Sequence, residues 1–147
     1  MTDNTTRLDH VVLWVRDPAA AADFYEKVLG LEPLHVAEFT AGKASFPSVR
    51  LNEETIFDLA PLTLAERMDV VPDAAKSAGH PVNHVCLALS EPDFDALRAR
   101  LEERGTPVSD ISQNAFGARG RARRSFYFRD PDGNVIEARH YGEDGAS

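Results

Sequence analysis

A histidine near the start of an apolar strand occurs twice in this chain, within two segments of the same layout. Leu8-Asp9-His10-Val11-Val12-Leu13-Trp14-Val15 matches Val82-Asn83-His84-Val85-Cys86-Leu87-Ala88-Leu89: an apolar residue, Asp or Asn, His, and a mostly apolar run. The histidines are 74 positions apart, and the same spacing separates two pairs of prolines, Pro18 from Pro92 and Pro33 from Pro107. Each strand-like run leads into a helix-like one, so the sequence predicts an internal duplication of a βα unit.

The remaining elements extend each repeat into a strand, a helix and three further strands. In the first half we expect a strand over 8–15, a helix that Asp17 caps and Gly30 ends, and strands over 34–38, 44–51 and 55–59. In the second half we expect a strand over 82–89, a helix over 90–104, and strands from Pro107, over 125–129 and over 135–141. We interpret 61–81 as a linker between the two half-modules, with a possible short helix over 64–68. The fold class is therefore α+β, a single domain over 1–147 with βαβββ half-modules at about 7–60 and 82–141.

Composition excludes several classes of protein. The 147 residues carry a net charge of −8, which argues against binding a nucleic-acid backbone. The single cysteine, Cys86, excludes an internal disulfide and fits a reducing compartment. The N-terminus has neither a basic start nor an apolar run, and no apolar segment approaches about 18 residues, so neither a signal peptide nor a membrane span is expected. The sequence thus favours a cytoplasmic protein.

The strand residues that are costly to bury suggest a metal site. Alternation places Glu137 in the middle of the closing strand, where a carboxylate needs a partner. A single strand histidine is usually a core or rim residue, but two in register with a carboxylate can form a facial site for a divalent metal. We therefore predict His10, His84 and Glu137 as metal ligands. Asp58, on the matching strand of the first half, is either a fourth ligand or a solvent-facing residue at a strand end.

Three segments carry a family resemblance. They are Leu8–Leu13 followed by Asp23-Phe24-Tyr25-Glu26-Lys27-Val28-Leu29-Gly30-Leu31, the Asn83-His84 strand, and Ser125-Phe126-Tyr127-Phe128-Arg129-Asp130-Pro131-Asp132-Gly133-Asn134-Val135-Ile136-Glu137. Over about residues 7–141 the chain resembles the vicinal oxygen chelate superfamily, which includes glyoxalase I, extradiol dioxygenases, fosfomycin-resistance thiol transferases and bleomycin-resistance proteins. The resemblance implies a cupped, barrel-like mixed sheet built from two βαβββ modules, with a metal inside the cup.

The resemblance also assigns positions. His10 matches the family's first-strand ligand, His84 the fifth-strand ligand and Glu137 the last-strand ligand. Asp58 sits where glyoxalase I enzymes carry Glu, and this shorter side chain departs from the four-residue glyoxalase shell. The His, His, Glu triad of the dioxygenases and thiol transferases is then the core of the site. Bleomycin-binding members generally lack these ligands, which argues against a purely drug-sequestering role.

Other residues are candidates for catalysis and substrate binding. Besides Glu137, Tyr127 is a catalytic candidate if it faces the cup, although we interpret it as a core aromatic. The basic segment 118–124 is either a solvated loop or an anion clamp, with Arg121 and Arg124 as its substrate-binding members. Arg139 and Trp14 are further substrate-binding candidates, the latter with core packing as its alternative. We interpret Cys86 as a small buried residue.

Together these observations predict a metal-dependent enzyme, nearest to a glyoxalase-type lyase or isomerase, that acts on a small substrate with two adjacent oxygens. The cofactor is one divalent metal ion: Zn, Ni, Mn or Fe(II). The alternatives are an extradiol-type dioxygenase and a non-catalytic protein that binds a small molecule such as an antibiotic. We expect a homodimer, as is usual for family members of this length, and no nucleic-acid or membrane partner.

Overall fold

The structure is a computed structural model that describes residues 8–65, 82 and 84–142. It divides into two compact units, Met1–His80 and Pro81–Ser147, and each is described by itself. Among the described residues, no helix is both long and apolar enough to cross a membrane.

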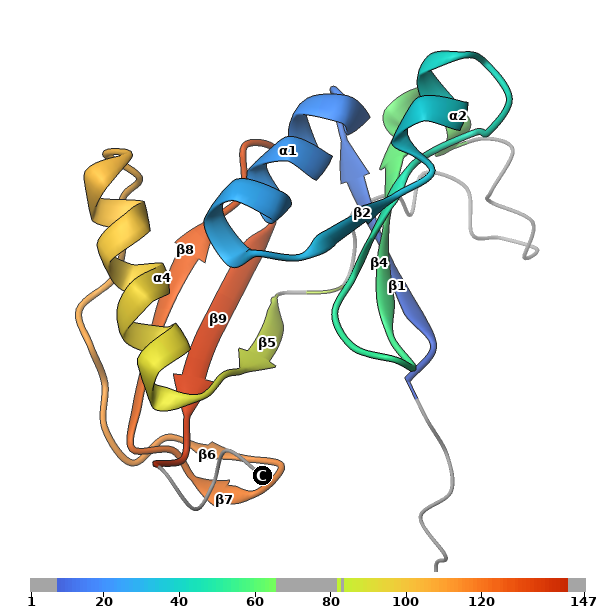
Figure 1. Cartoon of the computed structure of the whole chain (residues 1–147). Helices are drawn as coiled ribbons and strands as arrows, with labels where there is room; N and C mark the ends of the chain where they lie inside the picture. The colour runs from blue at the N-terminus through green and yellow to red at the C-terminus, as the bar shows by residue number, and fades with distance from the viewer. Residues whose placement is uncertain (1–7, 66–81, 83, 143–147) are drawn as a thin grey trace, which may run out of the picture. The chain divides into compact units, whose positions relative to one another are not determined.

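The first unit is a four-stranded sheet with helices in its connections (Figure 1). Its elements are β1 (His10–Val15), α1 (Pro18–Leu29), β2 (Glu32–Leu34), α2 (Val36–Thr40), β3 (Ser48–Arg50), β4 (Ile56–Pro61) and the short 3-10 turn η1 (Leu62–Leu64). The strand order is β1-β4-β3-β2, with β1 parallel to β4 and the other neighbours antiparallel. This order places the first and last strands of the βαβββ module side by side.

Helix α1 forms where its sequence signals predict it. The Asp17 carboxylate accepts a hydrogen bond from the backbone N–H of Ala20 (3.1 Å), and Pro18 starts the helix. Gly30 ends it in the left-handed region, with φ of 72°. The inward face of the helix packs on the sheet, where the rings of Tyr25 and Phe57 meet edge to face at 5.8 Å. These buried aromatics anchor the helix over β4.

Two strand predictions in the first unit are wrong. The segment predicted as a strand over 34–38 contains the end of β2 and then α2, because His35 adopts φ of 62°, which breaks an extended chain. The strand predicted over 44–51 is only Ser48–Arg50, and it follows Pro47, which has no N–H to donate to a ladder. The loop before β3 is correspondingly longer than expected.

The second unit has the same plan with a shorter main sheet. Its elements are β5 (Val85–Ala88), α4 (Glu91–Glu103), β6 (Phe116–Gly117), β7 (Gly120–Arg121), β8 (Arg124–Arg129) and β9 (Val135–His140). The sheet order is β5-β9-β8, with β5 parallel to β9, and β6 and β7 form a separate hairpin. The strand predicted from Pro107 is reduced to a single bridge between Val108 and Phe128.

Helix α4 covers one face of this sheet and does not cover the other. Figure 1 shows α4 running alongside β8 and β9. Its residues Phe94, Leu97 and Leu101 are buried, and the Phe94 ring lies 5.1 Å from the ring of Phe126 in β8 and 4.9 Å from that of His140 in β9. Alternation therefore sends Tyr127 and Glu137 to the opposite face.

The linker predicted over 61–81 is described only at its start. Of these residues, only 61–65 are described, so most of the helix predicted over 64–68 lies outside the described residues.

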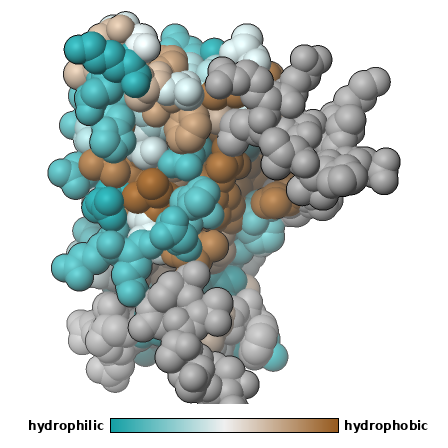
Figure 2. All heavy atoms as spheres, turned by 90° about the vertical axis from the view of Figure 1, so that its right-hand side faces the viewer, coloured by the Kyte–Doolittle hydropathy of each residue, from teal (hydrophilic) through white to brown (hydrophobic). Residues whose placement is uncertain are grey.

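The two faces of β1 differ in burial. Leu13 and Val15 are buried, whereas Val12 and Trp14 are half-buried. One face of β1 is therefore packed and the other is only partly covered. Figure 2 shows that, on the side of the molecule it draws, apolar residues gather between hydrophilic ones.

Candidate metal centre

In the first unit, an imidazole and a carboxylate face each other across two parallel strands. His10 starts β1, and its Nε2 lies 3.9 Å from Oδ2 of Asp58 in β4. Asp58 is buried, with 8% of its surface exposed, and its other oxygen accepts a hydrogen bond from Ser48 Oγ (2.7 Å). The interpretation of Asp58 as a solvent-facing residue is therefore wrong, because its carboxylate is buried and bonded to Ser48 on the neighbouring strand.

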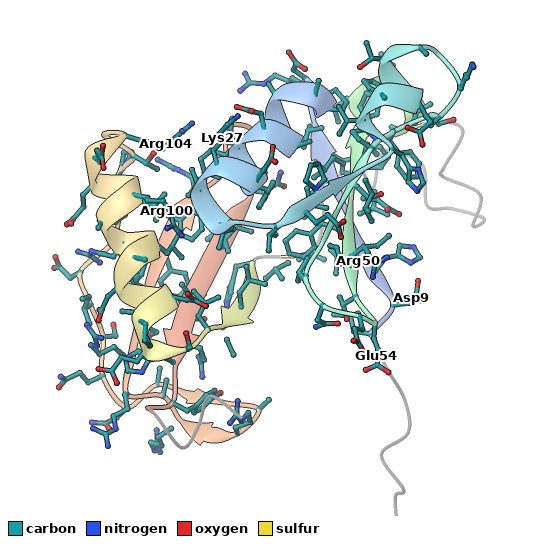
Figure 3. The ribbon with its side chains drawn as sticks, in the orientation of Figure 1. Asp9, Lys27, Arg50, Glu54, Arg100 and Arg104 are labelled. Carbon is teal, nitrogen blue, oxygen red and sulfur yellow. The ribbon has the colours of Figure 1, made fainter. Side chains whose placement is uncertain are left out.

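Asp9 orients the His10 ring. Its carboxylate lies 2.7 Å from His10 Nδ1 (Figure 3 labels Asp9 at the start of β1), and because an ionised carboxylate only accepts, the ring donates there. The Nε2 lone pair of the neutral ring then points toward Asp58. The hydrogen bond to Asp9 raises the pKa of His10 above its usual value, against the effect of burial, and the charge of Asp58 adds to it.

The second unit repeats this pairing. His84 stands immediately before β5, and its Nε2 lies 3.2 Å from Oε1 of Glu137 in β9. Glu137 is 2% exposed, and its other oxygen, Oε2, accepts a hydrogen bond from Arg139 Nη2 at 2.8 Å. In both units one carboxylate oxygen is held by a neighbour while the other faces an imidazole.

The two pairs occupy the same position in the sheet register. Val12, two residues after His10, pairs with Asp58, and Cys86, two residues after His84, pairs with Glu137. The repeated sequence motif thus produces the same arrangement in both units. In each unit, a histidine lies close to a carboxylate on the adjacent parallel strand. Within neither unit do the described residues gather three His, Cys, Asp or Glu side chains that could hold a metal.

A cavity of about 450 Å³ opens beside the second pair. Its lining residues are His84, Cys86, Ala88, Ala115, Ala118, Tyr127, Glu137, Arg139 and Tyr141. Tyr127 is 39% exposed, so its interpretation as a core aromatic is wrong, and its ring meets His84 edge to face at 5.3 Å. Cys86, expected to be buried, is exposed. Partial desolvation within the cavity, with the charge of Glu137 adding to it, raises the pKa of both Tyr127 and Cys86, which keeps the phenol and the thiol neutral.

Arg139 is the buried cation of this cavity. The guanidinium donates to Cys86 Sγ (3.2 Å) and to the Tyr141 hydroxyl (3.3 Å), besides its short contact with Glu137. Burial acts to lower the pKa of Arg139, but the hydrogen bonds to Glu137 and Tyr141 outweigh it and hold the pKa above its usual value. Its charge is therefore permanent.

The other substrate-binding candidates, Arg121, Arg124 and Trp14, are not among the residues that line this cavity. Arg121 Nη1 donates to the Asn114 carbonyl (3.0 Å). Arg124 points to the α4 side of β8, where Nη2 donates to Asp95 (2.8 Å) and Nε donates to His140 (3.0 Å). Trp14 is half-buried in the first unit and pairs with Ala60.

Sequence reasoning did not predict the groups that hold the ligand candidates in place. Asp9 could have been found, because it directly precedes His10 in the repeated motif. Arg139 could have been linked to Glu137 by strand alternation, which sets the two on one face. Ser48 had no such signal, since its contact with Asp58 depends on the pairing of strands that are distant in sequence.

Comparison with known proteins identifies the family. The model of the Glyoxalase/Bleomycin resistance protein/Dioxygenase superfamily matches residues 7–138. The chain belongs to this superfamily. The predicted fold of two βαβββ modules is accordingly confirmed as that of a glyoxalase-type α+β protein.

Individual relatives span nearly the whole chain. Virulence protein STM3117 from Salmonella typhimurium is 30% identical over 136 residues, which cover 92% of this chain and 84% of that protein. Its crystal structure superposes with a TM-score of 0.68 at 26% identity, covering 92% of this chain and 97% of that one. Metallothiol transferase FosB from Shouchella clausii is 27% identical over 131 residues, 88% of this chain and 77% of that protein. A lactoylglutathione lyase from Agrobacterium tumefaciens has a TM-score of 0.62 at 20% identity over 95% of this chain and 96% of that one, which shows a common fold.

Proposed function

We propose that this chain is a divalent-metal-dependent lyase or isomerase that acts on a small substrate with two adjacent oxygens. One observation carries the proposal: each unit holds a carboxylate by one oxygen, through Ser48 or Arg139, and turns the other oxygen toward a histidine Nε2. Such fixed, partly buried donor pairs are characteristic of ligands oriented for a metal ion. Membership in a superfamily with metal-dependent enzymes supports the same conclusion.

The donor sets fit a divalent ion. Two ligands that each bind a metal at roughly 2.0–2.2 Å, at tetrahedral or octahedral angles, lie about 3–3.5 Å apart. The 3.2 Å between His84 Nε2 and Glu137 Oε1 falls in this range, and the 3.9 Å between His10 Nε2 and Asp58 Oδ2 requires only a small adjustment. Imidazole and carboxylate together suit Zn, Ni, Mn and Fe(II). We propose that both pairs bind the same ion, with His10, His84 and Glu137 as its core ligands and Asp58 as the fourth.

The reaction would depend on a few side chains around the cavity. A bound metal would act as a Lewis acid on adjacent substrate oxygens. With Oε1 turned from the metal to the substrate, Glu137 would accept a proton there from the substrate carbon next to these oxygens and return it to the neighbouring carbon. The Tyr127 hydroxyl, which stays protonated, would donate a hydrogen bond to the oxygen where negative charge develops. In this proposal Glu137 and Tyr127 are the catalytic residues.

A second candidate is metal-dependent thiol transfer, which the identity of 27% with the metallothiol transferase favours. The chain would then activate a thiol for attack on a small electrophile. The dioxygenase and the non-catalytic binder are the other outcomes that the experiment must separate.

The test reconstitutes metal-free protein with Ni, Zn, Mn or Fe(II) and assays each form. The lyase proposal predicts turnover of the hemithioacetal of methylglyoxal and glutathione, followed as thioester absorbance. Tyr127→Phe should lower kcat by roughly 10²–10³-fold with metal content unchanged. Transfer of glutathione to an epoxide would favour the second candidate, and oxygen uptake with catechols under Fe(II) would favour a dioxygenase. Failure to bind any of these metals would overturn the proposal and favour a binder.

We also propose that the chain forms a homodimer in the cytoplasm. Light scattering should give about twice the chain mass of 16.2 kDa, and a mass near 16.2 kDa would contradict the dimer.

A further inference from the structure

In the cavity of the second unit, the positive charge of Arg139 is compensated by Glu137, which is a proposed metal ligand. Arg139 has only 7% of its side chain exposed, and its carboxylate partner Glu137 has 3% exposed. Their contact, Nη2 to Oε2 at 2.8 Å, joins two charges that would each be costly to bury alone. Among the described residues that line this cavity, Glu137 is the acidic side chain and Arg139 is its ion-pair partner, so their formal charges cancel.

Binding a divalent cation would change this balance. A metal ion bound to Glu137 would neutralise the carboxylate charge that otherwise compensates Arg139. The net charge of the metal, Glu137 and Arg139 together would then be about +2, instead of zero for the ion pair alone. Charges a few ångströms apart in a partly desolvated cavity interact strongly. An anion bound beside the metal would restore the balance, whereas a neutral molecule would not.

The guanidinium is suited to that role by its geometry. Its planar group presents a fork of N–H donors that matches a carboxylate or a phosphonate. Here each guanidinium nitrogen already donates, Nε to Cys86 Sγ, Nη1 to the Tyr141 hydroxyl and the Ala115 carbonyl, and Nη2 to Glu137. An anion in the cavity would replace the two longest of these contacts, those of Nη1 at 3.3 and 3.4 Å. The volume of about 450 Å³ is sufficient for a small organic anion.

The observations favour Arg139 over the arginines of the 118–124 segment. Arg124 is used on the other face of the sheet, where it bonds Asp95 and His140. Arg121 donates to the carbonyl of Asn114, and neither residue lines the cavity. The anion-binding role expected of that segment is therefore better assigned to β9.

We propose that Arg139 binds an anionic group of the substrate, a carboxylate or a phosphonate, and that this binding requires the metal held through Glu137. The inference rests on the proposed metal function and adds the substrate class to it. Because linkage is reciprocal, the anion should raise the affinity for the metal by the same factor that the metal raises the affinity for the anion.

The experiment uses methylphosphonate as the anionic probe and hydroxyacetone as a neutral probe with two adjacent oxygens. Binding to Mn(II)-loaded protein is followed by paramagnetic relaxation of each probe's methyl protons, and binding to metal-free protein by saturation transfer. Wild-type protein should bind methylphosphonate at least about tenfold more tightly when loaded. Arg139→Gln should weaken this binding by roughly 10–100-fold, the equivalent of one charged hydrogen-bonded contact, while hydroxyacetone affinity stays unchanged. Mn(II) is kept at saturation, so that the weaker Mn(II) affinity expected when Glu137 loses its partner leaves the Mn(II) stoichiometry unchanged.

Arg104→Gln is the matched control, since it removes the same charge from the exposed C-terminal end of α4 (Figure 3) and should have no effect. If Arg139→Gln does not fold, Arg139→Lys decides, because it retains the charge without the fork and should bind methylphosphonate about tenfold more weakly. An unchanged methylphosphonate affinity in a folded, Mn(II)-loaded Arg139 variant would overturn this inference and leave the metal proposal intact. Failure of the wild type to bind Mn(II), Zn, Ni or Fe(II) would overturn both.

Discussion

Replacing Asp58 by Asn separates a structural role of this carboxylate from a role as metal ligand. The buried carboxylate accepts from Ser48 Oγ at 2.7 Å. A hydrogen bond to a charged group contributes about 1.5–3 kcal/mol and a neutral one about 0.5–1.5 kcal/mol. Asp58→Asn should therefore destabilise the metal-free protein by only about 1–2 kcal/mol, a shift in Tm of a few degrees. If Asp58 is a ligand, metal affinity should fall by more than the roughly 10–100-fold that the loss of an outer-shell partner costs.

Ser48→Ala is the matched variant for this test. It removes completely the hydrogen bond that Asp58→Asn only weakens, but it keeps the carboxylate and its charge. Stability should therefore fall by about 1.5–3 kcal/mol while metal affinity falls much less than in Asp58→Asn. Stability is measured by urea unfolding of the metal-free proteins, and affinity by competition with a chelator. A wild-type metal affinity in Asp58→Asn would refute the reasoning and reduce Asp58 to a partner of Ser48.

Three further perturbations test the second unit and the support of His10. His140 is buried, and burial with the charge of Arg124 lowers its pKa, so its contribution to stability is complete above its usual value of about 6.5 and is lost as pH falls toward the lowered folded-state pKa. His140→Gln should flatten urea-unfolding stability between about pH 6.5 and 5 relative to wild type, and parallel profiles would contradict this role. Phe94→Ala should cost roughly 3–5 kcal/mol in urea unfolding, because the ring is fully buried against Phe126 and His140; a loss below about 1 kcal/mol would be incompatible with this packing. Asp9→Ala should weaken metal binding by roughly 10–100-fold in chelator competition, and an unchanged affinity would show that His10 needs no orienting partner.

The sequence predicted those features whose signals are local. The caps of α1, Asp17 and Gly30, are recognised from one residue each, and alternation along β9 correctly separates Glu137 and Arg139 from the residues under α4. The repeated histidine motif also predicted that both halves share one plan, because a duplicated strand must pair in the same way each time.

Features that depend on distant contacts or on one unusual dihedral angle were missed. The positive φ of His35 replaces a predicted strand by α2, and nothing in the local residue types signals it. Alternation could place Tyr127 opposite Phe126 and Phe128 but could not show that α4 covers the phenylalanine face. The arginines near β8 form one cluster in the sequence, but Arg124 lies on the face of β8 that α4 covers, where it is paired with Asp95 of that helix.

Metal content of His84→Ala tests the central claim most directly. His84 is exposed and precedes β5, so its removal should leave the fold of the second unit intact. His35→Ala is the control, because this imidazole lies at the start of α2, paired with Glu38. After reconstitution and desalting, elemental analysis should find about one divalent ion per chain in wild type and His35→Ala and almost none in His84→Ala. A normal metal content in folded His84→Ala would contradict the account.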